Sequence, residues 1–526
     1  MKLTFVNLYS PETVAKYLLS AYVLKAYLTK VFRNPEDLSI RILNFSCTAD
    51  IEQIIEAVLA EESDCVGYSC YTWNIEKISD IIRLLKKRIQ CTHVLGGPEI
   101  TLSWLRTQPD QALANYYVLG AGERILARLI NILDSQGTEE KIPPRGVAYL
   151  KNGTMQYEES TEGFENLDEI PSVYLTGTLE EELYERQQAY LETTRGCTFK
   201  CNYCMYHKNL SSISYYSLKR VFDELDYLIC QKEVWQLRIF DSDFACDIQR
   251  AKKIVRHLVE LKARQNVFMP WIYWEFTYYR IDEEFIELTA QLKNHNSILN
   301  SSLLKPADRL QHYSDMVKDY MVINCIGVQS FSKDALRAVN RPRINIRKFI
   351  AFMEMCKRHN VVLKIDFILG LPMETFESYF SGLETFLPHL HNTDHVLNIH
   401  RLQILPGCQL EQLCALYQIE YSQTAPHMVF STQTMSRKQM QLASKLTAVL
   451  FRLINSPLRR YVYTAKQRSG LTFHALLLLV FNAVQQESSM QNTPLITESF
   501  TDDMYWNSGV FKDLPSQFLL NVLEEL

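Results

Sequence analysis

Little in this sequence points to disorder or to a membrane. Glycine and proline number only 17 each in 526 residues, below the level at which chains stay unfolded. The most apolar late stretch, residues 471–484, is interrupted by His474 and falls short of the ~20 residues that cross a bilayer. We therefore expect a chain that folds throughout, with no membrane span and with a buried helix at 471–484.

The sequence also lacks a strong charge of either sign. Lysine and arginine total 55 against 60 aspartate and glutamate, for a net charge of −5. Proteins that bind nucleic acid present a basic face to the phosphates, and this balance does not predict one. We expect no nucleic-acid partner and favour a small-molecule or peptide substrate.

A secretory signal is missing as well. Residues 1–10 carry one lysine and a short alternating apolar run, which is typical of a β-strand and not of a signal peptide. Thirteen cysteines in a chain without export favour reduced thiols, so we expect a cytoplasmic protein. Ten of them are scattered and are expected to pack as small apolar side chains, whereas three are clustered.

Strand and helix patterns alternate over the first 138 residues. The run 64–70 is β-rich, and apolar residues at helical spacing follow Asn74, a candidate N-cap. Strands predicted at 93–95 and 117–119 each end in glycine-containing turns that open onto helices. The pattern predicts a Rossmann-like, doubly wound parallel sheet over 1–138, with its ligand crevice at the carboxyl ends of the strands.

A polar segment with three prolines, 139–187, is expected to be a linker with a small hairpin. Strand and helix patterns resume beyond it. Residues 411–526 read as a mainly helical C-terminal domain. About six βα units predict a partial (βα)6 barrel over 188–410, in an α/β chain, from strands at 190–194, 237–240, 271–276, 322–328, 362–369 and 396–404.

Three cysteines stand together just after the first of these strands. Cys197, Cys201 and Cys204 are therefore presented at a strand's carboxyl end, where barrel active sites lie. Three thiolates can hold three irons of a [4Fe–4S] cluster and leave the fourth open to an amine and a carboxylate. A structural zinc site, with His207 as its fourth ligand, is the alternative that the residues leave open.

The spacing C-x3-C-x2-C resembles the signature of the radical S-adenosylmethionine (SAM) superfamily. Further segments that resemble the family's strand motifs follow in its order between residues 189 and 410. The resemblance implies a [4Fe–4S] cluster on the three cysteines. It also implies SAM contacts from ten residues: Tyr203, Tyr206, Asp241, Asp243, Glu275, Gln329, Ser330, Arg341, Asp366 and Gly370.

Each of these segments has an ordinary structural explanation when taken singly. Asp241 and Asp243 could cap a helix, Ser330 could be an N-cap, Arg341 could be solvated, and residues 370–372 could form a simple turn. Five such segments follow the three cysteines in the order that the family has, and together they favour the family.

The N-terminal region resembles the cobalamin-binding domain that precedes the barrel in the B12-dependent subgroup of radical SAM enzymes. Residues 69–74, 96–99 and 120–123 stand where that subgroup has S-x-x-x-x-N, G-G-P-E and G-x-G-E. Glycine-ended strands let a large planar ring approach the backbone. The resemblance implies cobalamin contacts from twelve residues: Ser69, Tyr71, Thr72, Trp73, Asn74, Gly96, Gly97, Pro98, Glu99, Gly120, Gly122 and Glu123.

One cobalamin motif is absent. D-x-H-x-x-G supplies a lower histidine ligand to cobalt in other cobalamin proteins, and here no histidine precedes His93, which lies in a predicted strand and is expected to be core. Many members of the subgroup also lack the motif, so the resemblance still implies cobalamin, without a protein ligand on its lower face. A degenerate domain kept for packing is the alternative.

The resemblance implies an enzyme that reductively cleaves SAM at the cluster to form a 5′-deoxyadenosyl radical. With cobalamin it implies C-methylation of an unactivated carbon in a small-molecule or peptide natural-product-type substrate, and an electron donor such as flavodoxin or ferredoxin. A non-methylating rearrangement or cyclisation stays open, as does a metal-stabilised cobalamin carrier or scaffold without catalysis. A methylthiotransferase is disfavoured, because its extra cluster cysteines have no counterpart here. The sequence identifies neither the catalytic acid or base nor the substrate.

Overall fold

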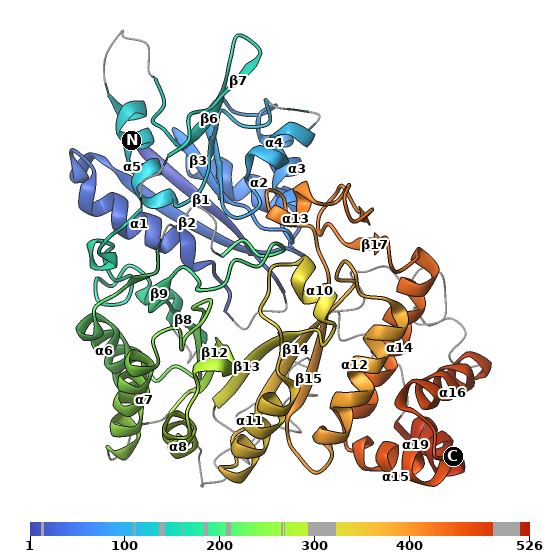
Figure 1. Ribbon diagram of the computed structural model, residues 1–526. Helices are drawn as coiled ribbons and strands as arrows, with labels where there is room; N and C mark the ends of the chain where they lie inside the picture. Colours follow the sequence, from blue (N-terminus) through green and yellow to red (C-terminus); the bar gives the residue numbers. More distant parts are fainter. Residues whose placement is uncertain are drawn as a thin grey trace.

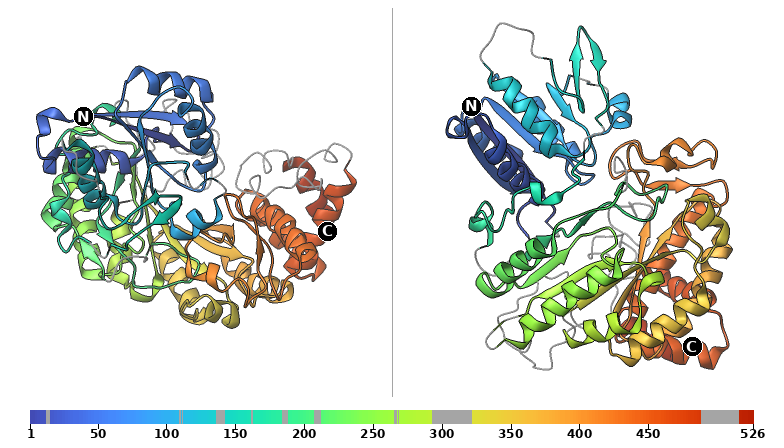
Figure 2. Two further views of the ribbon diagram at one scale, coloured as in Figure 1. Left: turned by 90° about the horizontal axis from the view of Figure 1, so that it is seen from above. Right: turned by 60° about the vertical axis from the view of Figure 1, so that its left-hand side comes forward.

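The computed structural model describes residues 1–11, 15–108, 110, 112–135, 142–160, 163–183, 188–206, 212–264, 267, 269–292, 322–487 and 516–526. Within them, a first sheet near the N-terminus is followed along the chain by a second sheet and then by a helical region (Figure 1). The C-terminal helices lie beside the second sheet and away from the first (Figure 2).

The first sheet is parallel through five strands in the order β2-β1-β3-β4-β5. Helices α1 and α5 contribute buried residues to a hydrophobic core that continues into the second sheet, and α2, α3 and α4 contribute to a separate core. Its strands are β1 (Lys2–Tyr9), β2 (Ser39–Ser46), β3 (Cys65–Ser69), β4 (Thr92–Gly96) and β5 (Tyr116–Val118). Its helices are α1 (Leu19–Val31), α2 (Ile51–Ala60), α3 (Ile75–Leu85), α4 (Leu102–Thr107) and α5 (Gly122–Asp134).

A hairpin extends this sheet beyond its parallel part. Strands β6 (Val147–Lys151) and β7 (Thr154–Gln156) continue the order after β5, and β6 pairs with β5 antiparallel. The sequence predicted a hairpin within the linker, but not that it would join the first sheet. The physical reason is that β5 offers an edge of unpaired N–H and C=O groups, which β6 satisfies.

The second sheet is a six-stranded parallel partial barrel whose strands follow one another in chain order. With the doubly wound first sheet and the helical C-terminus, it confirms the predicted fold class. Its strands are β8 (Gln188–Leu191), β11 (Gln236–Ile239), β12 (Trp271–Phe276), β13 (Val322–Gln329), β14 (Leu363–Leu369) and β15 (Val396–Arg401). Its helices include α6 (Leu218–Asp226), α7 (Ile248–Ala263), α8 (Glu283–Gln291), α10 (Lys333–Ala338), α11 (Ile346–Arg358) and α12 (Phe376–Phe386).

Alternation along the barrel strands decides which side chains face inward. In β12, Ile272, Trp274 and Phe276 are buried in the core, where Trp274 stacks on Phe244 with ring centroids 4.7 Å apart. Tyr273 and Glu275 therefore lie on the opposite, inner face, because successive side chains of a strand point to opposite sides.

The C-terminal region covers the edge strand β15. Asn455 follows α14 (Arg437–Ile454) and bonds the backbone of Leu397 in β15 through both its side-chain oxygen and its side-chain nitrogen, at 3.0 and 2.6 Å. An edge strand is thereby satisfied by a side chain. The other elements here are α13 (Gln409–Gln412), β16 (Glu420–Tyr421), β17 (Val429–Ser431), α15 (Arg459–Ser469), α16 (Phe473–Gln486) and α19 (Ser516–Glu525).

The apolar stretch at 471–484 falls in α16, which buries Leu476, Leu477 and Val480, as predicted. Among the helices of the described residues, none combines the length and the apolar character that crossing a membrane requires.

Candidate active site

A cavity of ≈ 820 Å³ opens between the two sheets. One wall comes from the carboxyl ends of β1, β3, β4 and β5 with the starts of α1 and α5. A sheet with the order 2-1-3-4-5 has its ligand crevice where β1 and β3 diverge, and this wall occupies that place. The facing wall comes from the barrel and the cysteine loop: Tyr190, Glu192, Arg195, Tyr206, Arg238 and Phe240.

Most of the residues expected to contact cobalamin meet in this cavity. Thr72, Asn74 and Glu99 lie outside its lining. The nine that line it are Ser69, Tyr71, Trp73, Gly96, Gly97, Pro98, Gly120, Gly122 and Glu123.

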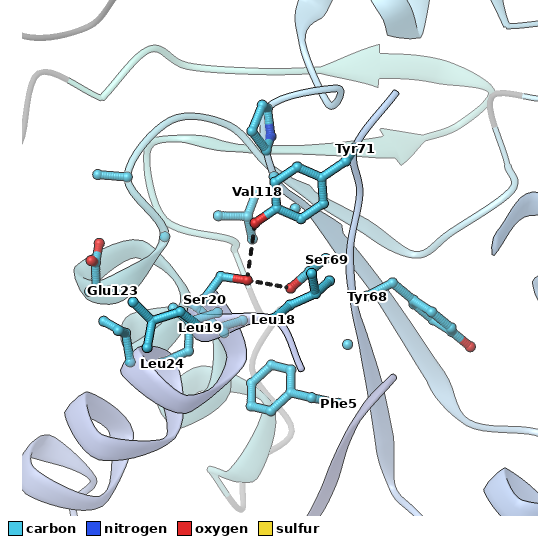
Figure 3. A pocket seen from close by; sticks show the side chains of 18 of the residues that line it. Phe5, Leu18, Leu19, Ser20, Leu24, Tyr68, Ser69, Tyr71, Val118 and Glu123 are labelled. Carbon is cyan, nitrogen blue, oxygen red and sulfur yellow. Dashed lines mark hydrogen bonds between the residues drawn. The ribbon is translucent and has the colours of Figure 1, made fainter. Parts of the chain in front are cut away.

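Hydroxyl groups and aromatic rings share this wall. The Ser20 hydroxyl lies 3.0 Å from that of Ser69 and accepts a hydrogen bond from the Tyr71 hydroxyl at 3.4 Å (Figure 3). The Tyr71 ring stacks on Trp73 with centroids 4.3 Å apart and planes 14° apart. Because Trp73 is 48% exposed, the pair offers a flat apolar surface. Sequence reasoning missed Ser20, since a serine near a helix start carries no motif.

Gly97 permits a close approach between two strand ends. Its φ is +115°, and a Cβ there would lie 2.5 Å from the carbonyl oxygen of Cys70. The Cys70 amide donates to the carbonyl of Gly96 at 2.7 Å, so the two turns are locked together. Any side chain at Gly97 would push the turns apart, and glycine therefore keeps this wall of the cavity in shape.

Asn74 shapes the wall from behind. It stands at the N-cap position of α3, as predicted, but its side chain makes no cap hydrogen bond. Instead its Oδ1 accepts from the Tyr71 amide at 2.7 Å, and its Nδ2 donates to the carbonyls of Ser69 and Leu8 at 2.9 and 3.2 Å. The amide thus ties the loop after β3 to the end of β1.

Glu99 also points away from the cavity. Its Oε1 lies 2.7 Å from Nε2 of His427, and the two residues are 1% and 5% exposed. This buried pair joins the first sheet to the C-terminal region. His93, expected to be core, is 1% exposed within β4, where its Nδ1 lies 3.1 Å from the Tyr68 hydroxyl. Burial lowers the pKa of His93 to about 4.

The cysteine loop is anchored to the segment after α10. The Asn202 amide donates to the carbonyl of Val339 at 3.0 Å, and the Asn340 side chain donates to the carbonyl of Lys200 at 2.9 Å. Within the loop, the Cys204 amide donates to the carbonyl of Cys201 at 3.0 Å. Burial raises the pKa of Cys204 to about 11.

The cysteines do not converge on one point. In the described part of the chain, no group of three or more His, Cys, Asp or Glu side chains is arranged to hold a single metal ion. A cubane cluster makes no such demand, because each thiolate binds a different iron. His207, the fourth ligand of the zinc alternative, lies outside the described residues.

Arg341 reaches the cysteine loop from the far side. Its guanidinium donates to Sγ of Cys201 at 3.4 Å and to the carbonyl of Gly327. A Cβ at Gly327 would lie 2.6 Å from Nε2 of Gln329 and 3.0 Å from Arg341, so glycine makes room for both side chains. Nε of Arg341 and Oε1 of Gln329 are buried without a hydrogen-bond partner among the described residues. Tyr203 is half-buried beside them, and burial raises its pKa above the ordinary value.

Asp241 and Asp243 are engaged by the protein itself. Asp241 accepts from the amides of Thr193 and Thr194 at 2.7 and 3.0 Å, and burial raises its pKa to about 6. Asp243 accepts from the Thr277 amide and from Arg280, both at 3.3 Å. Their carboxylates therefore hold the strand ends beneath the cysteine loop, and neither caps a helix.

Ser330 donates to Oε1 of Glu374, a buried carboxyl to which the sequence analysis gave no role. Burial raises the pKa of Glu374 to about 8. Its Oε2 has no partner in the part of the chain that is described. Gly370 has φ +95°, and a Cβ there would lie 2.9 Å from Cε of Met440, so it admits α14 close to the strand end.

A polar ladder crosses the inner face of the barrel. Glu275 accepts from the Tyr273 hydroxyl at 3.0 Å, and Asp366 accepts from Cys325 at 2.8 Å and from Asn398 at 2.7 Å. Burial alone would raise the pKa of Asp366, but nearby Lys364 holds it below its usual value. The ladder places polar groups along the lumen below the cysteine loop.

Comparisons with known proteins match two separate parts of the chain. Residues 21–130 match the family model of the B12 binding domain, and residues 191–380 match that of the radical SAM superfamily. The chain therefore carries one region of the B12 binding domain family and one region of the radical SAM superfamily.

Two curated proteins are similar to about two thirds of this chain. The cobalamin-dependent radical SAM methyltransferase TokK of Streptomyces tokunonensis is 23% identical over 370 residues, which is 69% of this chain and 50% of that protein. The 2-(S-pantetheinyl)-carbapenam-3-carboxylate methyltransferase of Streptantibioticus cattleyicolor is 22% identical, over 66% of this chain and 48% of that protein. The chain thus spans about half the length of the curated relatives it matches.

A solved structure supports the fold. The cobalamin-dependent SAM radical enzyme OxsB, with aqua-cobalamin and SAM bound, superposes with a TM-score of 0.62 at 15% identity, over 100% of this chain and 80% of that one. At this identity the likeness bears on the fold alone.

An ion network joins the region that matches the B12 binding domain to the region that matches the radical SAM superfamily. Arg195, two residues before Cys197, lies 2.8 Å from a carboxylate oxygen of Glu123 at the start of α5 and 3.0 Å from one of Glu192. Burial raises the pKa of Glu192, and the two carboxylates hold the pKa of Arg195 above its ordinary value against burial. The sequence named Glu123 but missed Arg195, whose partner lies far away in the chain.

The residues present fit the groups that the family uses. Three thiols on one anchored loop suit an iron–sulfur cube, and the orphaned polar atoms of Gln329 and Arg341 lie beside that loop. The cavity's glycine-lined wall and stacked rings suit a large planar cofactor.

Proposed function

We propose that this radical SAM enzyme binds a [4Fe–4S] cluster through Cys197, Cys201 and Cys204, SAM beside that cluster, and cobalamin in the ≈ 820 Å³ cavity. We further propose that it C-methylates an unactivated carbon of a small-molecule or peptide natural-product-type substrate, in the cytoplasm, with flavodoxin or ferredoxin as electron donor. The observation that carries the proposal is the cavity itself, which joins nine expected cobalamin residues to the barrel wall next to the cysteine loop.

When bound, these groups supply hydrogen abstraction and methyl transfer. The chain's own task is to hold the reactants and keep water out. Tyr71 and Trp73 give the cobalamin wall a flat apolar surface. The Arg195 guanidinium bridges Glu123 and Glu192, so the wall and the cysteine loop keep one spacing. The lining of the cavity is mainly apolar, which limits the water held beside reactive species.

The proposal is tested by anaerobic reconstitution with iron, sulfide, SAM, cobalamin and a reductant. We expect about four irons per chain and release of 5′-deoxyadenosine. Cys204→Ala should abolish the product, because one cluster ligand is lost. Cys230→Ala removes an exposed thiol outside the site and should leave the product unchanged. Wild-type protein that carries zinc and no iron would contradict the cluster assignment.

Methyl transfer is tested separately with SAM that carries a deuterated methyl group. Incorporation of the label into a product supports methylation. A product without label that has lost hydrogen identifies the rearrangement or cyclisation instead.

A further inference from the structure

We propose that Arg238 is an anion-recognition residue of this active site, and that the substrate carries a carboxylate or phosphate group that Arg238 binds. The inference rests on the proposed function, because it names the class of molecule that the same site accepts.

Arg238 belongs to the wall between the two cofactor regions. It lies in β11, where Leu237 and Ile239 are fully buried, so alternation turns Arg238 to the inner face of the barrel. It pairs in register with Tyr190 on one side and Tyr273 on the other, and it lines the ≈ 820 Å³ cavity. The side chain is 42% exposed there.

The guanidinium keeps its donors available. An arginine has five N–H donors in a planar fork that matches an oxyanion. Among the described residues Arg238 makes no hydrogen bond, and its ion-pair partner, Oε1 of Glu275, is 3.9 Å away. The guanidinium carbon lies 4.6 Å above the Tyr273 ring, which steadies the group without using its N–H donors.

The two other arginines near the cysteine loop differ in this respect. Arg195 is held by Glu123 and Glu192, and Arg341 donates to Cys201 and to the carbonyl of Gly327. Both therefore bind groups of the protein itself, and the one unpartnered nitrogen of Arg341, Nε, is buried. Of these three cations, Arg238 is the one whose donors face the cavity uncommitted.

The position is also suitable for a substrate. Tyr206, on the cysteine loop, is 60% exposed into the same cavity. Tyr71 of the cobalamin wall lines the same cavity. An oxyanion on Arg238 would thus hold a molecule between the cluster loop and the cobalamin wall.

Two molecules can supply a carboxylate to Arg238: the substrate and the methionine part of SAM. The experiment separates them. Reconstituted wild-type protein and the variants Arg238→Gln and Arg238→Lys are titrated with SAM by calorimetry. The SAM-loaded proteins are then titrated with phenylacetate and with its neutral isostere phenylacetamide, by saturation-transfer NMR. Arg256→Gln, on the outer surface of α7, is the matched control.

We expect wild type to bind phenylacetate in preference to phenylacetamide. Arg238→Gln should weaken phenylacetate on the order of 10- to 100-fold, as for a lost charge-assisted hydrogen bond, and should leave SAM affinity unchanged. Arg238→Lys should retain part of the preference, and the α7 control all of it.

Three results would overturn the inference: no preference for the anion in wild type, equal binding of phenylacetate by Arg238→Gln, or a selective loss of SAM affinity, which would assign Arg238 to SAM. Iron content and 5′-deoxyadenosine release are measured in the same preparations. If these are intact, the failure belongs to the anion site and not to the proposed function.

Discussion

At the scale of single residues, the site contains charged side chains that are buried. Arg341 lies 3.4 Å from Sγ of Cys201, and Glu374 is a carboxyl buried beneath the same strand ends. The residue type alone predicts neither the contact of Arg341 nor the burial of Glu374, because most arginines and glutamates are exposed. Both follow from the residues that surround them in the fold.

Arg341→Gln should lower the reduction potential of the cluster on the order of tens of millivolts, because hydrogen bonds and positive charge beside a cluster sulfur stabilise the reduced state. An EPR-monitored redox titration measures the shift. Arg337→Gln, exposed on α10, is the control and should leave the potential unchanged. A potential that is the same in Arg341→Gln and wild type would refute the contact with Cys201.

Glu374 should make stability depend on pH. Its folded pKa is about 8, above its unfolded value near 4.5. The folded state therefore holds the proton more tightly, and stability falls as pH rises from about 4.5 to 8. Glu374→Gln should flatten this slope and add a few kcal/mol, as an order of magnitude, at pH 8.

Urea unfolding of the cluster-free protein between pH 5 and 8.5 measures this slope. Glu377→Gln, at an exposed position in the first turn of α12, should keep the wild-type slope. A slope that persists in Glu374→Gln would mean that another group titrates.

At the scale of elements, the turns at the strand ends set the width of the cavity. Gly97 and Gly153 both have positive φ, +115° and +74°. They differ in space, because a Cβ at Gly97 would lie 2.5 Å from the Cys70 carbonyl oxygen, whereas one at Gly153 would meet nothing within 4 Å.

Gly97→Ala should therefore cost on the order of 2–4 kcal/mol of unfolding free energy, and Gly153→Ala about 1 kcal/mol, the backbone cost alone. Urea unfolding of the two variants gives both values. Retention of cobalamin on a desalting column should fall for Gly97→Ala only. Equal losses in the two variants would show that the contact with Cys70 is not what requires glycine.

Many of the strands and helices could be predicted from the sequence, because periodicity and glycine turns are local signals. Four of the five parallel strands of the first sheet, the six barrel strands and the buried helix at 471–484 were predicted for that reason, whereas β2 was not. The attachment of β6 to β5 was not, because strand pairing depends on an edge distant in the chain. For the same reason, the Asp241 contacts with Thr193 and Thr194 were missed.

At the scale of the whole molecule, buried pairs join regions far apart in the chain. Glu99 and His427 are separated by 328 positions, and their side chains meet at 2.7 Å. Removing one partner of a buried pair leaves the other polar group uncompensated.

Glu99→Gln and His427→Gln should each destabilise the protein on the order of 3 kcal/mol, and the double variant by less than the sum. Urea unfolding of all four proteins completes the cycle. The exposed pair Asp80 and Arg83 serves as the control cycle, with an expected coupling below about 1 kcal/mol. Additive losses at Glu99 and His427 would mean that the contact does not couple the two regions.

The bridge from Arg195 to Glu123 also limits how such proteins can be recombined. A chimera that takes residues 1–160 from a relative would inherit whatever side chain that donor has at position 123. If that side chain is not acidic, Arg195 of the recipient loses one of its two carboxylate partners. Exchange of whole N-terminal modules therefore succeeds only between donors and hosts that keep this acid and base together.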